Sequence, residues 1–462
     1  MSHLTTTETS TFTTHRRARF RRIGFSVIAS LIARGLSLVI TIITTPLTLK
    51  YLGPERYAIW VTLSSITALL AFADLGIGNG LLNSISEANG KDDRAAAQKS
   101  LSNAFLMLTS LALLIGIVLI ALYPVIPWDK IYNVTSPLAK SESGPVTAVF
   151  IACFLINMPL GIVQKALMGY QETYIDNVWS MFARIGSLIG IFLAVRLDLG
   201  LVGLVIALVG LPILTTICEW VQMFWFRRPW LRPSLRNIDP KIIWFLMRLG
   251  WMFFALQIAG TLAYNIDNLV IAQVISPEAV TNYSIPSQLF KLSTVFISLV
   301  SLPLWPAYGE AIARHDLSWV RKTFRLSLLI NFASSALLSL ILVVGGKPII
   351  RLWVGQTITP DLALMIALAT WTIIYNVSSA FSMLFSAANA IRFQVVWALL
   401  MAVVNLALSV VLTRQFGAIG VVLGSIISYL VCIFPVYFWK VPRLFAELEA
   451  RQIAAIAVVE QA

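Results

Sequence analysis

Charged residues are scarce in this chain of 462 residues, of which only 12% are Asp, Glu, Lys or Arg while 58% are hydrophobic. A soluble domain of this length needs far more charge to cover its core, so the composition excludes the soluble globular class. The mean hydropathy of +0.84 agrees with this conclusion. The chain is therefore predicted to be a polytopic membrane protein.

Cysteine and histidine are also scarce, at three residues each. All three cysteines lie inside apolar runs, where they act as small hydrophobic side chains, and no CxxC or His/Cys cluster exists. The sequence therefore indicates no disulfide, no metal site and no cofactor. It contains no GxxxxGK[ST] phosphate loop, which argues against direct ATP drive. The formal charge of +13 is spread over short loops, so no nucleic acid is expected as a partner.

Twelve apolar runs are long enough to cross a membrane, at about 20 residues per helix. Helices satisfy their own backbone hydrogen bonds in lipid, so the predicted fold class is an all-α membrane protein with two parallel six-helix repeats. The predicted spans are 23–46, 57–82, 101–123, 145–168, 177–195, 201–226, 242–265, 283–304, 326–344, 362–385, 395–413 and 417–439.

Basic residues set the predicted orientation. With both termini in the cytoplasm, the cytoplasmic tails and loops hold 22 of the 34 Lys and Arg residues. The first apolar run follows HRRARFRR without a small-residue cleavage site, so it is predicted to be a retained helix. The predicted organisation is a disordered cytoplasmic tail (1–22), an N-terminal bundle (23–226), a basic cytoplasmic linker (227–241), a C-terminal bundle (242–439) and a cytoplasmic tail (440–462).

The two halves of the sequence carry glycine, proline, glutamate and tryptophan residues at matching positions. Because each repeat has an even number of crossings, both halves must have the same orientation, which is typical of transporters built from parallel repeats. We expect a substrate site in the cleft between them. The matched positions are Gly53-Pro54-Glu55 with Ser276-Pro277-Glu278, Glu87 with Glu310, Trp179 with Trp397, and Gly200 and Gly203 with Gly417 and Gly420.

Arg34 is the best candidate for a substrate-binding cation, since it lies near the middle of the first span, where a charge is costly. Thr41 and Thr45 share its face at helical spacing. The repeat maps this stripe onto a second polar stripe on the seventh span. The alternative is hydrogen bonding between helices without a substrate. The second stripe is Gln257, Tyr264 and Asn268.

Five further intramembrane charges are candidates. Lys291 on the eighth span shares a polar stripe, which favours a cavity role. Arg184 and Arg248 lie about two turns from cytoplasmic helix ends, so snorkelling explains each of them and a role at an inward-facing mouth stays open. Asp74 and Asp267 are candidates for proton or sodium coupling or for pairing with a cavity arginine. For Asp74 the FADLGIGNG context also allows a helix-shaping role.

Four segments together resemble the polysaccharide-exporting branch of the multidrug/oligosaccharidyl-lipid/polysaccharide (MOP) superfamily, the Wzx-like O-antigen and capsule-repeat flippases. The segments are TPLTLKYLGPERYAIW, FADLGIGNGLLNSISEANGKDDR, LMGYQETYIDNVW and NIDNLVIAQVISPEAVTNYSIP. The resemblance implies a twelve-helix fold with a cationic central cavity. It also implies export of a polyprenyl-diphosphate-linked oligosaccharide across the bacterial inner membrane for cell-surface polysaccharide assembly.

Two other functions compete with a flippase. A cation-coupled multidrug exporter of the same fold would favour carboxylates in its cavity, whereas the deepest charge here is an arginine. A glycan polymerase or ligase usually depends on a large outer loop, and the longest one here, 124–144, is small. We therefore expect a transporter and not an enzyme, which acts as a monomer with membrane lipids, the lipid-linked glycan, and a polysaccharide polymerase and chain-length machinery as partners.

Overall fold

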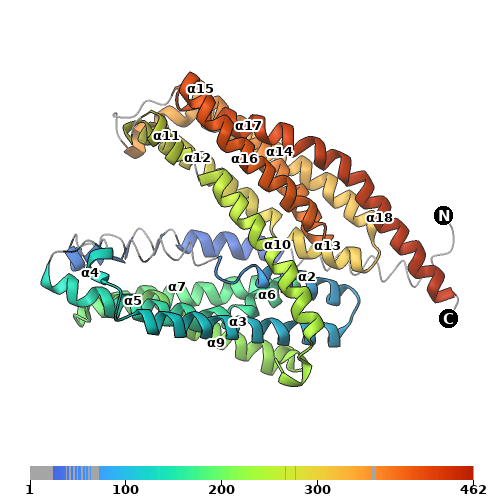
Figure 1. Ribbon diagram of the computed structural model, residues 1–462, viewed down its shortest axis with the longest axis horizontal. Helices are drawn as coiled ribbons and strands as arrows, with labels where there is room; N and C mark the ends of the chain where they lie inside the picture. The colour runs from blue at the N-terminus through green and yellow to red at the C-terminus, as the bar shows by residue number, and fades with distance from the viewer. Residues whose placement is uncertain are drawn as a thin grey trace. The chain divides into compact units, whose positions relative to one another are not determined.

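The computed structural model describes residues 24–37, parts of 39–63, and 72–460 except 133, 135, 266, 276 and 355–360. Its described residues are helical and include no strand, which confirms the all-α fold class. They form two compact units, one ending at Trp251 and one beginning at Met252 (Figure 1). This boundary lies inside α10 (Pro240–Asn265), and the predicted bundle limits 23–226 and 242–439 stay a prediction.

The unit that ends at Trp251 is built from antiparallel helices joined by short turns. Its helices begin with the apolar stretch Gly24–Ser37. They continue as α2 (Ile77–Gly90), α3 (Arg94–Leu122), α4 (Trp128–Ile131), α5 (Pro137–Leu160), α6 (Ile162–Gly169), α7 (Thr173–Arg196), α8 (Gly200–Val205), the π-helical η1 (Ile206–Gly210), α9 (Leu211–Val221), the π-helical η2 (Gln222–Arg227) and the 3₁₀ turns η3 (Pro229–Leu231) and η4 (Leu235–Asn237).

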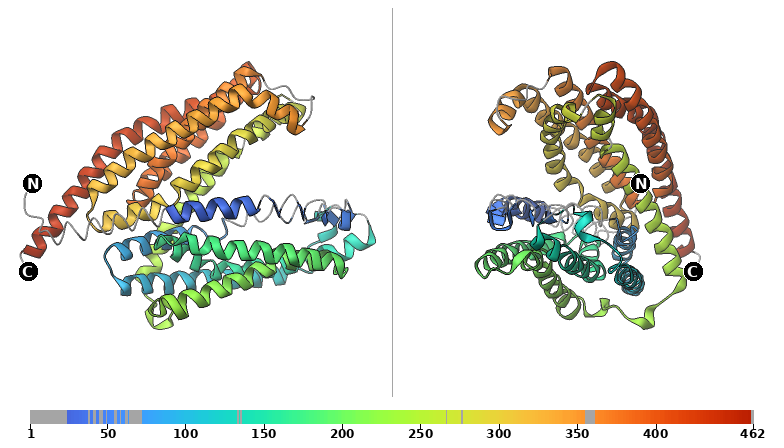
Figure 2. Two further views of the ribbon diagram at one scale, coloured as in Figure 1. Left: turned by 180° about the vertical axis from the view of Figure 1, so that it is seen from behind. Right: turned by 60° about the vertical axis from the view of Figure 1, so that its left-hand side comes forward.

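The unit that begins at Met252 contains the rest of α10 and eight further described helices, several of which run side by side in yellow to red in Figure 2. They are α11 (Asp267–Val274), α12 (Pro277–Ser301), α13 (Leu304–Ala313), α14 (Leu317–Val354), α15 (Leu362–Ala387), α16 (Ile391–Phe416), α17 (Ile419–Cys432) and α18 (Phe434–Glu460).

Ten helices among the described residues are long and apolar enough to cross a membrane. They overlap the third to twelfth predicted spans, so the chain is a multi-pass membrane protein. The first predicted span is described in part by the helix Gly24–Ser37. Part of the second, 57–82, lies outside the described residues, namely 58, 61, 62 and 64–71, so the count of twelve stays a prediction.

Glycines at matched positions of the repeat have the same backbone conformation. Gly200 and Gly417 have φ values of 68° and 66°, in the left-handed region that favours glycine, and each precedes a helix. A Cβ added at Gly420 would lie 2.3 Å from the backbone of Leu412, so only glycine lets α16 and α17 approach this closely. The positive φ values and the close helix approach explain why glycine occurs at these positions of the repeat.

Candidate functional site

Helix α7 carries the polar side chains that meet the helix Gly24–Ser37. Asn177 Nδ2 donates a hydrogen bond of 2.8 Å to Ser30 Oγ, and Arg184 Nη1 donates one of 2.6 Å to Ser37 Oγ. Ser26 and Ala33 of the same helix are buried, at 1% and 4% exposed. Small side chains on this face let the two helices pack closely, and the serine hydroxyls join them.

Arg34 lies beside this packed face and is exposed. At 100° per residue its direction is about 70° around the helix from the face that contains Ser30 and Ser37. The Arg184 bond to Ser37 places a second exposed arginine within one helical turn of Arg34. The structure thus brings together two cations that the sequence placed on the first and fifth spans. Thr41 and Thr45, the rest of the predicted stripe, lie outside the described residues.

Asp74 shapes the start of α2. Its Oδ1 accepts from Gly76 N at 2.9 Å and its Oδ2 accepts from Gly78 N at 3.2 Å. Gly76 has a φ of 74°, which a glycine adopts without strain. These contacts fit the helix-shaping alternative for Asp74, and its ion-coupling role stays a prediction.

Lys165 of α6 lies next to Asp74. Its Nζ donates a hydrogen bond of 2.8 Å to Asn79 Oδ1, and Asp74 and Asp176 both act on it electrostatically. A Cβ on Gly78 would lie 2.8 Å from Asp74 Oδ2 and 3.0 Å from Lys165 Cε, so both side chains pack directly against this glycine. The half-buried Lys165 is therefore the cation between two acids that lie on different helices.

Further charged residues lie along α7, as far as Arg184, and on α9. Asp176 interacts electrostatically with Arg184 as well as with Lys165. It also interacts electrostatically with Glu219 of α9. Glu219 is 1% exposed, and its Oε1 has no hydrogen-bond partner among the described residues. We call Asp74, Lys165, Asp176, Arg184 and Glu219 the charge cluster.

Sequence reasoning had placed only two members of the charge cluster among the site residues. Lys165, Asp176 and Glu219 were not among its candidates. One signal was available, since Lys165 interrupts the apolar run IVQKALMG only one turn before the polar segment GYQET. A charge so placed either snorkels or finds a partner, and the structure supplies the partner.

The second unit holds a smaller polar pair. Tyr283 Oη donates a hydrogen bond of 2.6 Å to Asp267 Oδ2, both residues are buried, and Asp267 Oδ1 has no partner among the described residues. Lys291 is exposed and acts electrostatically on Asp267, so the structure brings two predicted site residues together. Gln257 is half-buried and Asn268 is exposed, while the Tyr264 side chain lies outside the described residues.

Arg248 is exposed on the part of α10 that packs against α2. A Cβ on Gly250 would lie 3.0 Å from Ile77 N, which shows how closely the two helices approach. No hydrogen bond or ion pair joins Arg248 to another candidate residue within the part of the chain that the structure describes. Its role at a cavity mouth stays a prediction.

Glu142, which the sequence places in an outer loop, lies in α5 and joins three parts of its unit. Arg56 Nε and Nη2 donate to its two carboxylate oxygens at 2.6 and 2.8 Å, and Leu201 N donates to Oε1 at 3.2 Å. The interpretation of Glu142 as an ordinary loop charge was therefore wrong. The pairing joins two residues that lie 86 positions apart in the sequence.

Replacing Glu142 with glutamine is expected to lower the melting temperature of the detergent-solubilised protein by about 2–4 °C. The reason is that one buried partner of a bidentate ion pair is lost, at about 1–2 kcal/mol for a pair that is still partly exposed. Glu447→Gln is the matched control, because Glu447 pairs with Lys440 at the surface, where its side chain is 49% exposed. Equal melting temperatures for the two variants would contradict the structural role.

The described residues contain no group of three His, Cys, Asp or Glu side chains that could hold a metal ion. The polar chemistry of both units therefore consists of fixed cations, carboxylates and hydroxyls. Such groups can bind an anion, exchange a proton or join helices, according to which of them the substrate reaches.

Comparison with known proteins gives a family and a fold. A family model described as "Polysaccharide biosynthesis protein" matches residues 21–311. A protein of Salmonella typhimurium named for O-antigen transport is 21% identical over 86% of this chain and 90% of its own length. A protein of Yersinia pseudotuberculosis named for O-antigen export is 20% identical over 61% of this chain and 64% of its own length.

Two solved structures share the fold. A point mutant of a MATE protein superposes with a TM-score of 0.78 over 94% of this chain and 97% of that one, at 15% sequence identity. A MOP superfamily transporter from Pyrococcus furiosus, whose binding pocket is reported to have reversed polarity, superposes with a TM-score of 0.76 over 93% and 97% of the two chains, at 14% identity.

Proposed function

The chain belongs to the family of polysaccharide biosynthesis proteins, and from that premise we propose that it flips a polyprenyl-diphosphate-linked oligosaccharide across the bacterial inner membrane. The recognition of the MOP superfamily from the sequence is confirmed by the family match and the fold. The chain is a membrane transporter and not an enzyme. The lipid-linked substrate, its use in cell-surface polysaccharide assembly, and a polymerase with chain-length machinery as partners belong to the proposal.

The observation that supports the substrate is the pair of exposed arginines, Arg34 and Arg184, on adjacent helices. Arg184 is held at Ser37 by a hydrogen bond of 2.6 Å, one turn from Arg34. A diphosphate carries its negative charges on neighbouring oxygens, and guanidinium groups bind such oxygens with two parallel hydrogen bonds. Two arginines so close together offer a diphosphate more than the single point charge of a lysine.

The test of this function is transport by the purified protein in sealed vesicles. A polyprenyl-diphosphate-linked fluorescent sugar is placed in both leaflets, and a membrane-impermeant quencher reports how much of it is accessible outside. Without protein, the charged head group crosses slowly because charge is costly in hydrocarbon. We expect rapid loss of the protected fraction only in vesicles with protein, and an unchanged protected fraction would contradict the function.

We propose alternating access as the mechanism, with the head group in a cleft and the polyprenyl tail in lipid. The parallel repeat supports it, since two like-oriented bundles can open to either side in turn. Asp267 is the better candidate for proton or sodium coupling, because one oxygen bonds Tyr283 while the other has no partner among the described residues. Both oxygens of Asp74 already accept from backbone amides. A transport rate independent of both gradients would exclude coupling.

A cation-coupled multidrug exporter is the second candidate function. The observation that favours it is that Glu219 and Asp267 are buried carboxylates, each with one oxygen that has no partner among the described residues. Carboxylates suit cationic drugs, whereas the exposed arginine pair suits an anion. Drug-sensitivity profiles of a strain with and without the protein separate the two, because only an exporter protects against cationic drugs.

A further inference from the structure

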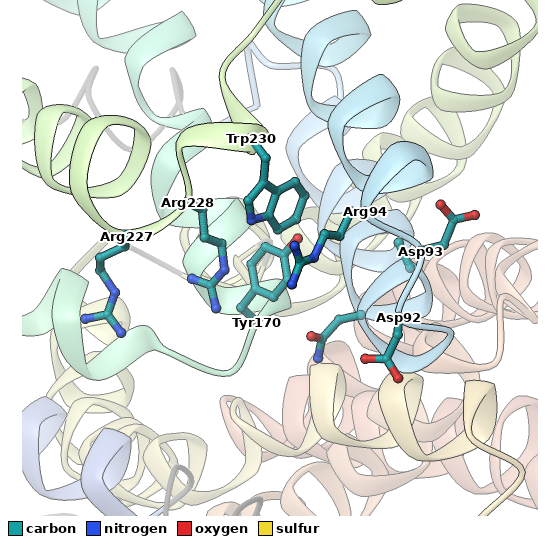
Figure 3. Close-up of a pocket in the computed structure, with 9 residues that line it drawn as sticks. Asp92, Asp93, Arg94, Tyr170, Arg227, Arg228 and Trp230 are labelled. Carbon is teal, nitrogen blue, oxygen red and sulfur yellow. The ribbon is translucent and has the colours of Figure 1, made fainter.

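A pocket of about 590 Å³ lies at one end of the first unit, where three connections between helices meet. The α2–α3 turn supplies Asp92 and Asp93, the α6–α7 turn supplies Tyr170, and the segment after η2 supplies Arg228 and Trp230. Arg94, at the start of α3, and Arg227, at the end of η2, complete the polar lining (Figure 3). None of these residues belongs to the charge cluster.

Three arginines line this pocket, and two of them pair with the same acid, Glu172. Arg228 donates to both oxygens of Glu172, at 2.7 and 3.1 Å, and Arg227 shares the same carboxylate at 3.4 Å. One carboxylate therefore balances two guanidinium groups. Arg94 lies over the Trp230 ring at 5.5 Å and forms no ion pair with any described residue. Three acids, Asp92, Asp93 and Glu172, lie at this pocket together with its three arginines, so the positive charge is concentrated around Arg94, Arg227 and Arg228 and is not a net excess.

Tyr170 adds a hydroxyl that has no partner among the described residues. Its ring lies under Arg228, 4.0 Å from the guanidinium carbon, and the side chain is only 4% exposed. Burial raises the pKa of Tyr170 to about 12, although Arg228 opposes this shift. The phenol thus keeps its proton at every physiological pH. It is a hydrogen-bond donor in the pocket wall, and no acceptor for it lies among the described residues.

The two ends of the pocket differ in sign. In Figure 3 Arg227 lies at one side of the pocket and the carboxylates of Asp92 and Asp93 lie at the other. Arg228, Tyr170 and Arg94 lie between these two sides. The Asp93 side chain caps α3 by accepting from Ala96 N at 2.9 Å. A ligand that fits this polarity carries an anion at one end and hydrogen-bond donors at the other.

Exposed aromatic side chains lie at this end of the unit. Trp225 and Phe226, which directly precede Arg227, are 53% and 78% exposed. Tryptophan and other aromatic residues concentrate at the level of lipid head groups. The pocket itself is built from turns at the ends of helices that are long and apolar enough to cross a membrane, so we expect lipid phosphates at its depth.

We propose that the pocket of Arg94, Arg227, Arg228 and Tyr170 binds the phosphate of a membrane lipid head group, with the hydroxyls of that head group facing Asp92 and Asp93. The phosphate accepts hydrogen bonds from the guanidinium groups and from the Tyr170 hydroxyl. The pocket recognises the phosphate whether or not the chain moves a lipid-linked glycan. Its failure and the failure of the proposed function are therefore separate results.

The test measures the melting temperature of the full chain in detergent as lipid is titrated. Phosphatidylglycerol, phosphatidylcholine, a polyprenyl diphosphate and soluble glycerol phosphate are compared. For the wild type we expect phosphatidylglycerol to raise the melting temperature and phosphatidylcholine to do so much less. The Arg94→Gln/Arg227→Gln variant is expected to need about tenfold more phosphatidylglycerol for the same shift.

Two further variants keep the test sharp. Arg236→Gln removes one positive charge, where the double variant removes two, from an exposed residue of the linker outside the pocket, and is expected to respond like the wild type. Tyr170→Phe deletes a hydroxyl that has no partner among the described residues, so it should not lower the melting temperature without lipid but should weaken the lipid response. Equal titrations for Arg94→Gln/Arg227→Gln and Arg236→Gln would overturn the proposal. An equal shift with glycerol phosphate would overturn the lipid source, and a shift with polyprenyl diphosphate alone would assign the site to that lipid.

Discussion

In a strain that depends on this protein for surface polysaccharide, Lys165→Met is expected to reduce the surface glycan by about tenfold or more. Lys165 is the cation between Asp74 and Asp176, and it also bonds Asn79 at 2.8 Å. Removing the cation that lies near two acids is destabilising, and for the half-buried Lys165 we expect a loss of about 2–3 kcal/mol. Arg184 then becomes the remaining cation of the cluster near Asp176, which draws it away from Ser37 and breaks up the arginine pair.

A double variant separates stability from transport. Lys165→Met with Asp176→Asn removes one charge of each sign, so of the two acids near Lys165 only Asp74 remains, and its oxygens accept from Gly76 N and Gly78 N. We expect its abundance in the membrane and its melting temperature to recover most of the loss, while glycan export stays low. Quantitative blotting of membranes and surface-glycan staining are the measurements. Wild-type export by Lys165→Met at equal abundance would show that the cluster has no part in transport.

Apolar length alone was enough to predict ten of the spans, because the cost of exposing backbone and charge in lipid acts on each segment separately. The repeat was readable for the same reason, since Gly200 at the start of α8 and Gly417 just before α17 both have a left-handed φ. These features depend on residues close together in the sequence. The fold class and the MOP superfamily could therefore be predicted before the structure.

Pairings between distant segments could not be predicted in the same way. Glu142 meets Arg56 across 86 residues, and Lys165 meets Asn79 across another 86. Snorkelling and pairing leave the same trace in a sequence, namely a charge near a helix end, and only the packed structure separates them. Arg184 shows the ambiguity, because it lies near a helix end, as the snorkelling interpretation requires, yet its guanidinium bonds Ser37.

Replacing Arg34 with alanine tests the substrate proposal directly. Arg34 is exposed, so its loss should change the free energy of unfolding by no more than about 0.5 kcal/mol. A charge-assisted hydrogen bond to a diphosphate oxygen is worth about 1.5–3 kcal/mol, which corresponds to roughly a 10- to 100-fold loss of transport rate. The vesicle assay with the polyprenyl-diphosphate-linked sugar measures this rate at matched protein density.

Charge and shape have separate effects at Arg34. Arg34→Lys keeps the charge but loses the planar fork, so we expect it to retain part of the rate that Arg34→Ala loses. Arg196→Ala is the matched control, because Arg196 is also exposed but lies at the end of α7, twelve residues after Arg184, where its guanidinium stacks on Phe192. If Arg34→Ala and Arg196→Ala transport equally fast, the diphosphate does not bind at the arginine pair. A loss specific to Arg34 with unchanged stability, by contrast, can only come from a cation that the substrate itself contacts.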